Sequence, residues 1–204
     1  MNAPDPPRKM TPRDSEGRRI SQKQRLVLGW TAIVVLAGAV AILFWLAYHF
    51  WGPFSVGFSF AVVWLPMMWL GTASRVVTPR LPASYHNLRA WERDGRVYEW
   101  VGIRLFKRLL RRGPMSVFNP HLRLPEKQTP DRIAFLRQRM CDAEASHAIL
   151  FVLTNGYAVY VALIGVWLST LSVLLFNLFV NGYPVMLQRY NRALLAKQFG
   201  KTPK

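Results

Sequence analysis

The sequence "LVLGWTAIVVLAGAVAILFWLAYHFWGPFSVGFSFAVVWLPMMWLGTAS", residues Leu26–Ser74, contains no Asp, Glu, Lys or Arg. A helix crosses the hydrocarbon core of a bilayer with about 20 residues, so this run is long enough for two crossings. Gly52-Pro53 marks a turn in its middle, and the aromatic residues on both sides are of the kind that prefers the membrane–water interface. The pattern therefore predicts two spans, near residues 26–51 and 53–73, with Pro66 placed to kink the second.

A second charge-free run, Ala148–Leu187, also fits two crossings, with Gly165 and the stretch 167–170 as candidate turns. All 27 Lys and Arg residues lie outside the two runs, although the chain is 51% hydrophobic and carries a formal net charge of +17. Such segregation argues against a nucleic-acid-binding domain, because charge-free stretches of about 40 residues or more are not found in such domains. It predicts an all-α integral membrane protein with four transmembrane helices.

Four spans place all three basic segments on one side of the membrane, and the positive-inside rule makes that side the cytoplasm of a cell (inner or plasma) membrane. Both chain termini are then expected to be cytoplasmic. The expected segments are a disordered basic tail (1–25), transmembrane hairpin 1 (26–74), a cytoplasmic membrane-surface segment (75–147), transmembrane hairpin 2 (148–187) and a second basic tail (188–204).

The cytoplasmic segment between spans two and three contains a predicted basic amphipathic helix, Val97–Gly113. Apolar residues recur at helical spacing on one side, and basic residues fall on the other; the apolar set is Val101, Leu105, Phe106, Leu109 and Leu110. Two interpretations stay open. The helix anchors the protein to anionic phospholipid, or some of its cations bind the phosphates of an acyl-CoA or a lipid.

A further helix is expected to begin at Asp131, after Thr129-Pro130, and to run without a break into the third span. Near the membrane entry it carries Glu144 and His147, three residues apart and so on one face. A carboxylate beside an imidazole is an arrangement for general-base catalysis, in which the carboxylate orients the ring. The alternative is a solvated Glu-His pair at a helix end, or a Glu144 partner from another segment.

Weaker candidates for chemistry are His121 with Glu126, as an acid–base pair, and Cys141, as an acyl carrier. Asn155 and Asn177 lie within the predicted spans, where interhelical hydrogen bonding explains them. Asn181 is different because Gly182, Tyr183 and Pro184 follow it and predict a local break before the polar residues 188–192. The sequence indicates no metal site and no cofactor.

Three segments resemble the glycosyl-4,4′-diaponeurosporenoate acyltransferases, which esterify a fatty acyl chain onto the sugar of a glycosylated carotenoid acid. They are "GRVYEWVGIRLFKRLL", "AEASH" and "NGYPVMLQRYNR", and they span about half of the chain. Phe106, Leu110 and Ala193 depart from the residues usual in that family. The resemblance implies that the following residues contribute to a substrate site: Tyr98, Glu99, Lys107, Asn181, Tyr183, Gln188, Arg189, Tyr190, Asn191 and Arg192.

The resulting hypothesis is a membrane acyltransferase that moves an acyl group from acyl-CoA or another thioester donor to a hydroxyl of a membrane glycolipid. His147 is expected to accept the hydroxyl proton and Glu144 to orient it. Arg189 and Arg192 are expected to bind donor phosphate or stabilise the oxyanion, with hydrogen bonds from Asn181 or Asn191. The alternative is a non-catalytic basic membrane protein that binds anionic lipid or serves as a partner subunit.

Overall fold

The computed structural model describes residues 21–74, 76–77, 79–112 and 129–200, with the backbone alone for Arg111 and Arg112. The described chain is helical, and its elements in order are α1 (Gln22–Trp51), α2 (Val56–Ala73), a 3-10 turn η1 (Ala90–Glu92), α3 (Arg96–Trp100), α4 (Ile103–Arg112), α5 (Pro130–Leu163), α6 (Trp167–Asn177), a π-helical turn η3 (Leu178–Gly182) and α7 (Tyr183–Phe199).

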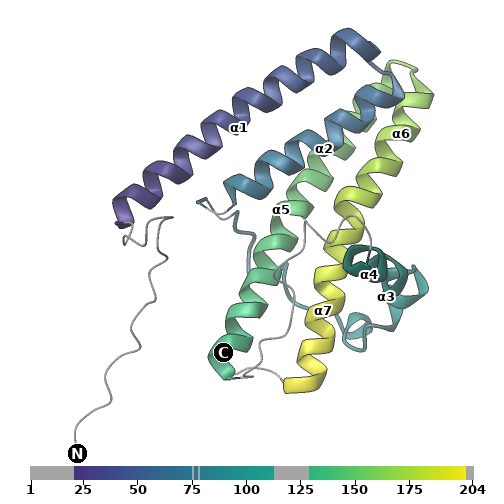
Figure 1. Cartoon of the computed structure of the whole chain (residues 1–204). Helices are drawn as coiled ribbons and strands as arrows, with labels where there is room; N and C mark the ends of the chain where they lie inside the picture. Colours follow the sequence, from purple (N-terminus) through teal and green to yellow (C-terminus); the bar gives the residue numbers. More distant parts are fainter. Residues whose placement is uncertain (1–20, 75, 78, 113–128, 201–204) are drawn as a thin grey trace, which may run out of the picture.

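Four helical runs are long and apolar enough to cross a membrane: α1, α2, α5, and the continuous run from α6 through η3 to α7. They lie side by side, and α3 and α4 pack beside the lower half of α7 (Figure 1). Helix α2 contacts α5 and α6, whereas α1 packs on α2 alone among the described helices. The predicted all-α fold is therefore confirmed for the described residues, and the four expected helices are long and apolar enough to span a membrane.

The two predicted hairpin turns are present. Helix α1 ends before Gly52, which has a φ of +74°, and α2 begins after Ser55, whose hydroxyl accepts a hydrogen bond from the Phe58 N–H. Helices α5 and α6 meet at Gly165, with a φ of +80°, a conformation that favours glycine. Residues 167–170, the other candidate turn, already belong to α6. Helix α2 runs continuously through Pro66.

The local break expected at Asn181–Pro184 is wrong, because the helix continues through a π turn. The Tyr183 N–H bonds to the Leu178 carbonyl, one residue further back than in an α-helix. Pro184 then stands in the first turn of α7, where its missing N–H is tolerated. Residues 188–199, expected as the start of a tail, form the last turns of α7. Likewise α1 begins at Gln22, inside the predicted N-terminal tail, which otherwise lies outside the described residues.

The helix expected over Val97–Gly113 is not one continuous element. Gly102, with a φ of +81°, separates α3 from α4, and Gly113 lies outside the described residues. The apolar residues of α4 differ in burial. Phe106 is buried and packs with Leu110 against α7, whereas Leu105 is 59% exposed. One side of α4 is therefore part of the protein core.

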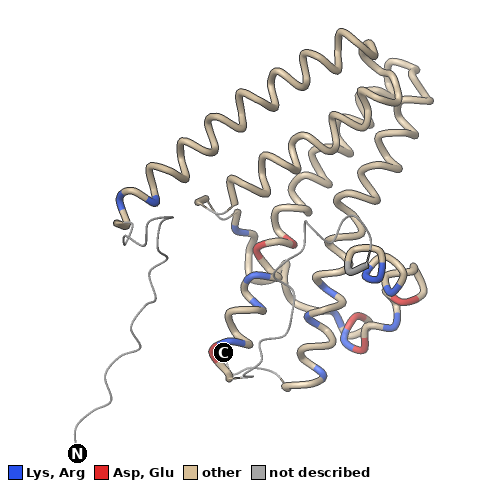
Figure 2. The backbone as a smooth tube through the Cα atoms, in the orientation of Figure 1, with Lys and Arg blue, Asp and Glu red and all other residues tan. Residues whose placement is uncertain are grey.

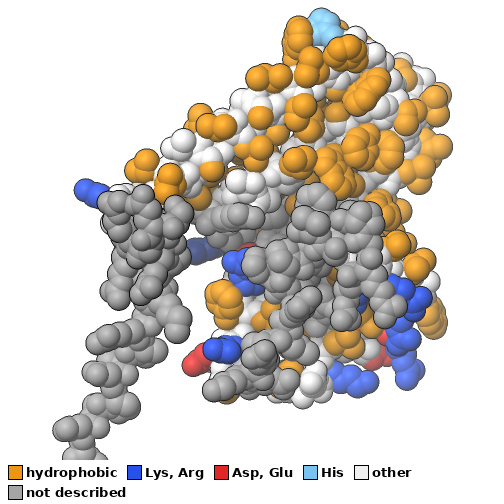
Figure 3. Space-filling view, viewed as in Figure 1, with side chains coloured by type: hydrophobic (Ala, Val, Ile, Leu, Met, Phe, Trp, Pro, Cys, Tyr) orange, Lys and Arg blue, Asp and Glu red, His pale blue; other side chains and the backbone are white. Residues whose placement is uncertain are grey.

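Charge and hydrophobicity divide the molecule along its length. Figure 2 shows that the Lys, Arg, Asp and Glu residues gather at the ends of the helices remote from the α1–α2 turn, whereas the other half is free of them. Figure 3 shows hydrophobic side chains over the outer surface of that charge-free half, including α1. Large exposed side chains there, such as Trp45 and Phe50, fit a surface facing lipid.

Candidate functional site

A buried ion-pair cluster lies where the charged end of the bundle begins. It consists of Glu92 from η1, Glu144 from α5, and Arg189 and Arg192 from α7, and it contains equal numbers of acidic and basic groups. Glu144 is fully buried, and Glu92 and Arg192 are nearly so. Charges buried to this extent require partners, because an unpaired ion in a low dielectric is costly.

Arg189 is the centre of the cluster, and its N–H groups all have acceptors. Its Nε and Nη2 atoms lie 2.7 and 2.8 Å from the two oxygens of Glu92, a bidentate pair, and its Nη1 lies 2.7 Å from Oε1 of Glu144. The remaining N–H groups donate to the Tyr85 carbonyl at 3.1 Å and the Asn87 carbonyl at 3.3 Å. Arg189 thus ties the segment before α3 to the long helices.

Arg192 makes the second link between α7 and α5. Its Nη2 donates to Oε2 of Glu144, and its Nη1 donates to the His86 carbonyl. Its side chain is 3% exposed. Neither Arg189 nor Arg192 therefore presents a free guanidinium edge to a donor phosphate, so the phosphate-binding role expected for them does not fit this arrangement.

Glu92 is the acidic residue that holds the segment between α2 and α3 to the cluster. Burial alone would raise the pKa of its carboxyl, but hydrogen bonds from Arg189, from the Tyr98 hydroxyl and from the Arg89 N–H lower that pKa to about 2. Tyr98, a residue expected at the site, is buried here.

Gly95 precedes α3 with a φ of +76°, and a Cβ there would lie 3.1 Å from the Tyr190 ring, so glycine permits this close approach.

A partly exposed polar group joins α3 and α4 to α7. The Tyr190 hydroxyl donates to Oε1 of Glu99 at 2.9 Å, Arg104 donates to the same oxygen at 2.7 Å, and both lower the pKa of Glu99. Lys107 donates to Oδ1 of Asn191 at 2.8 Å. The predicted residues Glu99, Lys107, Tyr190 and Asn191 are thus brought together.

The remaining polar residues of the expected site have different partners. The Tyr183 hydroxyl donates to the Val101 carbonyl at 2.9 Å. Gln188 is buried, and its Oε1 accepts no hydrogen bond. His121 and Glu126 lie outside the described residues, and Cys141 is a half-buried free thiol.

Glu144 and His147 do not form the expected pair. Residues three apart differ by about 60° around the helix axis, and the two side chains point to different neighbours. The carboxylate of Glu144 faces the arginines, whereas Nδ1 of His147 lies 3.3 Å from Oδ1 of Asn181 and the ring also bonds the Val180 backbone. In a regular helix an N–H at position 184 would bond the Val180 carbonyl; Pro184 has none.

His147 therefore belongs to a chain of amides inside the bundle. Asn181 donates to Oδ1 of Asn177 at 2.9 Å, and Asn177 donates to the Phe151 carbonyl at 3.0 Å. Asn155 donates to the same carbonyl at 2.8 Å. This network satisfies polar groups that would otherwise be costly in hydrocarbon, and it agrees with the interhelical role expected for Asn155 and Asn177.

Sequence reasoning missed His86, which lies beside Glu144: its Nδ1 is 3.6 Å from Oε2 of Glu144. It also missed Glu92, the main partner of Arg189. The composition could have indicated these residues, because the chain has only 10 Asp and Glu residues for 27 Lys and Arg residues. An acidic residue in such a chain is a strong candidate for a buried ion pair.

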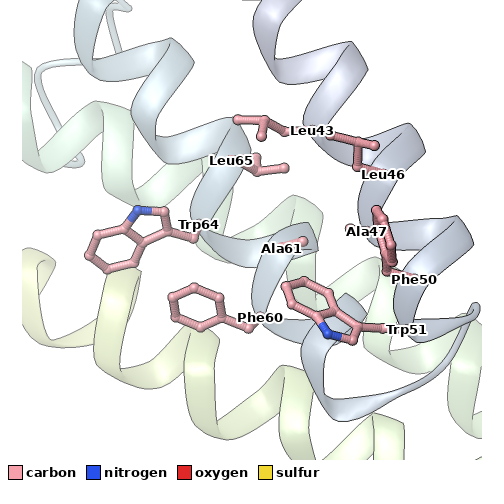
Figure 4. Close-up of a pocket in the computed structure, with 9 residues that line it drawn as sticks. All are labelled: Leu43, Leu46, Ala47, Phe50, Trp51, Phe60, Ala61, Trp64 and Leu65. Atoms are coloured by element: carbon pink, nitrogen blue, oxygen red, sulfur yellow. The ribbon is translucent and has the colours of Figure 1, made fainter.

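At the other half of the bundle, an apolar groove of about 410 Å³ opens between α1 and α2. Figure 4 shows side chains of both helices around it, and those lining it include Leu43, Ala47, Phe60, Ala61, Trp64 and Leu65. Among the described residues, none of those lining the groove is titratable. Its lining is suited to an apolar chain.

A family model for glycosyl-4,4′-diaponeurosporenoate acyltransferases matches residues 82–201. None of the curated proteins and none of the solved structures matches the chain. The matched region is more than half of the 204 residues; it includes the whole ion-pair cluster and the amide chain, and it omits α1 and α2. The chain therefore belongs to the glycosyl-4,4′-diaponeurosporenoate acyltransferase family, an acyltransferase family of carotenoid biosynthesis.

Proposed function

We propose that the protein transfers a fatty acyl group from a thioester, acyl-CoA in the first instance, to a sugar hydroxyl of a glycosylated carotenoid acid or a similar membrane glycolipid. The hydroxyl oxygen attacks the thioester carbonyl, a C–O bond forms and the C–S bond breaks. The hydroxyl proton leaves with the thiol. The family match supports the acyl transfer, and the acceptor is the one for which the family is named.

The observation that carries this proposal is the assembly of three distant segments at the charged end of the bundle. Residues from α3 and α4, from the middle of α5 and from α7 meet there through the ion-pair cluster and through the Lys107–Asn191 and Tyr190–Glu99 hydrogen bonds. At the charged end of the bundle, next to the apolar half, a water-soluble thioester and an acceptor dissolved in the bilayer can meet. The residues lining the apolar groove belong to α1 and α2 in the half of the bundle that Figure 2 shows free of charged residues.

Of the two sets of cations considered for the donor phosphates, the exposed arginines around α3 and α4 fit better than Arg189 and Arg192. Arg96 and Arg104 are 81% and 70% exposed, and Arg108 on α4 is exposed as well. Exposed guanidinium groups can bind phosphate at little cost of desolvation. We assign donor binding to this surface rather than to Arg189 and Arg192, whose terminal guanidinium nitrogens face carboxylates and carbonyls; Nε of Arg192 has no partner but is buried.

The direct test is acyl transfer by the purified full-length protein in nanodiscs. Radiolabelled palmitoyl-CoA and a glycosylated carotenoid acid are supplied, and the product is identified by its mass and by release of free CoA. We expect a product heavier than the acceptor by one acyl group. Release of CoA without acylation of the acceptor, or no turnover with either acyl-CoA or acyl carrier protein thioesters, would refute the proposal.

The membrane orientation is part of the proposal, with the charged end in the cytoplasm. On a Cys141→Ala background, a cysteine at exposed Pro53 in the α1–α2 turn should react with a membrane-impermeant maleimide in intact cells. A cysteine at exposed Ala83, near the cluster, should react only after permeabilisation. Labelling of Ala83→Cys in intact cells would contradict this orientation.

A second candidate function is supported by the outer surface of α3 and α4. Trp100 at the end of α3 is 88% exposed, and Leu105, Leu109 and Arg104 of α4 are exposed as well, a combination typical of contact with an anionic lipid surface. In this second candidate function, the protein is a non-catalytic membrane protein that binds anionic lipid or serves as a partner subunit. A membrane that contains the protein but shows no acyl transfer, together with selective retention of anionic phospholipid during purification, would favour it.

A further inference from the structure

His86 has an environment unlike that of a surface histidine. Its Nδ1 atom is buried, has no hydrogen-bond partner, and lies 3.6 Å from Oε2 of Glu144. The His86 side chain as a whole is nevertheless 17% exposed to solvent. That exposure comes from other atoms of the side chain, and Nε2 is not among the buried unpaired atoms of the described residues, whereas Nδ1 faces a fully buried carboxylate.

The backbone around His86 is held in place by the same cluster. The His86 carbonyl accepts a hydrogen bond from Nη1 of Arg192, and the carbonyls of Tyr85 and Asn87 accept from Arg189. The Tyr85 and His86 rings pack edge to face, with their centroids 5.2 Å apart. The loop that carries the imidazole is thus fixed at three consecutive residues, which is the precision that a catalytic side chain needs.

The groups that face His86 favour one tautomer. Glu144 from α5 faces Nδ1 and Tyr85 lies beside the ring, while Arg189 and Arg192 from α7 donate to the backbone carbonyls of Tyr85 and His86. A carboxylate oxygen accepts more than one hydrogen bond, so Oε2 of Glu144 has capacity for Nδ1–H beside its bond from Arg192. A proton on Nδ1 leaves the lone pair on Nε2, and an arrangement of carboxylate, imidazole and outward-facing Nε2 is that of a general base.

We propose that His86 is the general base of the acyl transfer and that Glu144 positions it; this inference rests on the proposed function. Nε2 accepts the proton of the acceptor hydroxyl as its oxygen forms the C–O bond at the thioester carbonyl. The imidazolium then returns the proton to the departing thiolate when the C–S bond breaks. Protons and electron pairs balance without another reactant. His147 lacks this arrangement, because its ring bonds Asn181 and the Val180 backbone.

The decisive variant is His86→Asn, assayed in the purified full-length protein in nanodiscs. The Asn amide nitrogen can take the place of Nδ1 facing Glu144, but nothing replaces Nε2. A base role predicts a folded protein whose kcat falls about 10²- to 10⁴-fold, with the KM for acyl-CoA within about twofold of wild type. A purely structural role predicts that His86→Asn transfers acyl groups at the wild-type rate, and that result would overturn the proposal.

A second variant, His86→Ala, opens space for added imidazole. We expect millimolar imidazole to restore part of the lost turnover, whereas it should not rescue His147→Ala. His49→Asn, at an exposed histidine in the last turn of α1, is the matched control and should keep wild-type kinetics. Abolished transfer in His147→Asn together with full transfer in His86→Asn would assign the base to the other histidine.

The wild-type assay separates the two proposals. If the wild-type protein transfers no acyl group, the proposed function fails, and the role of His86 fails with it. If the wild-type protein is active and His86→Asn is equally active, the acyltransferase assignment stands and only the role of His86 is refuted.

Discussion

The ion-pair cluster and the α1–α2 hairpin show two ways in which this chain holds its helices together. In the cluster, Arg189 alone connects α7 to Glu92, to Glu144 and to two loop carbonyls. In the hairpin, α1 extends over 30 residues and buries only Ile33 and Ala47. A single polar link, from the Trp69 indole to the Ile33 carbonyl at 3.3 Å, joins α2 to it among the described interactions.

The difference reflects the solvent of each region. Lipid competes well for an apolar helix surface, so α1 needs few contacts and is held mainly by its own length and by the bilayer. Buried charges have no such alternative, because neither lipid nor the protein interior solvates a lone ion. The cluster is therefore dense, neutral and sensitive to the loss of any member, whereas the hairpin should tolerate substitution.

The largest effect is expected from Glu144→Gln. The substitution keeps the shape of the side chain but leaves Arg189 and Arg192 with one buried carboxylate between them, and breaking a buried pair costs about 3–5 kcal/mol. We expect a large fall in the melting temperature in detergent and in the amount of monodisperse protein. Asp94→Asn, at an exposed acid outside the cluster, is the control and should leave both unchanged. A wild-type melting temperature for Glu144→Gln would show that the cluster does not stabilise the fold.

An intermediate effect is expected from Arg189→Lys. Lysine keeps the positive charge, but its ammonium cannot reproduce the bidentate bond to Glu92 together with the bond to Glu144, and a hydrogen bond to a charged group contributes about 1.5–3 kcal/mol. The melting temperature should fall less than in Glu144→Gln. The matched control is Arg96→Lys, at a side chain that is 81% exposed. Equal stability of both variants would mean that charge alone matters at position 189.

The smallest effect is expected from Ser59→Ala in the apolar half. The Ser59 and Ser169 hydroxyls lie 2.8 Å apart between α2 and α6, and such bonds in membrane bundles contribute about 0.6 kcal/mol. Ser169→Ala and the double variant should show the same small loss, because each removes the same bond. Val35→Ala, at a side chain that is 67% exposed on α1, should change nothing measurable. A loss for Ser59→Ala as large as that for Arg189→Lys would remove the distinction between the two regions.

The sequence by itself determined the membrane architecture. Two runs without Asp, Glu, Lys or Arg, each long enough for two crossings, leave few alternatives, because backbone groups in hydrocarbon must be satisfied within helices. The turn at Gly52-Pro53 and the one at Gly165 followed from local residue chemistry. The family resemblance also assigned residues of two distant segments, 98–107 and 181–192, to one substrate site.

Only the tertiary structure decided which side chains meet. Helical spacing placed Glu144 and His147 on one face, but the partners of Glu144 come from α7 and from the loop at His86, which are distant in sequence. Spacing along one helix carries no information on contacts of that kind. The structure likewise divided the predicted amphipathic helix at Gly102 and buried Phe106, since packing against α7 competes with a lipid surface for the same apolar residues.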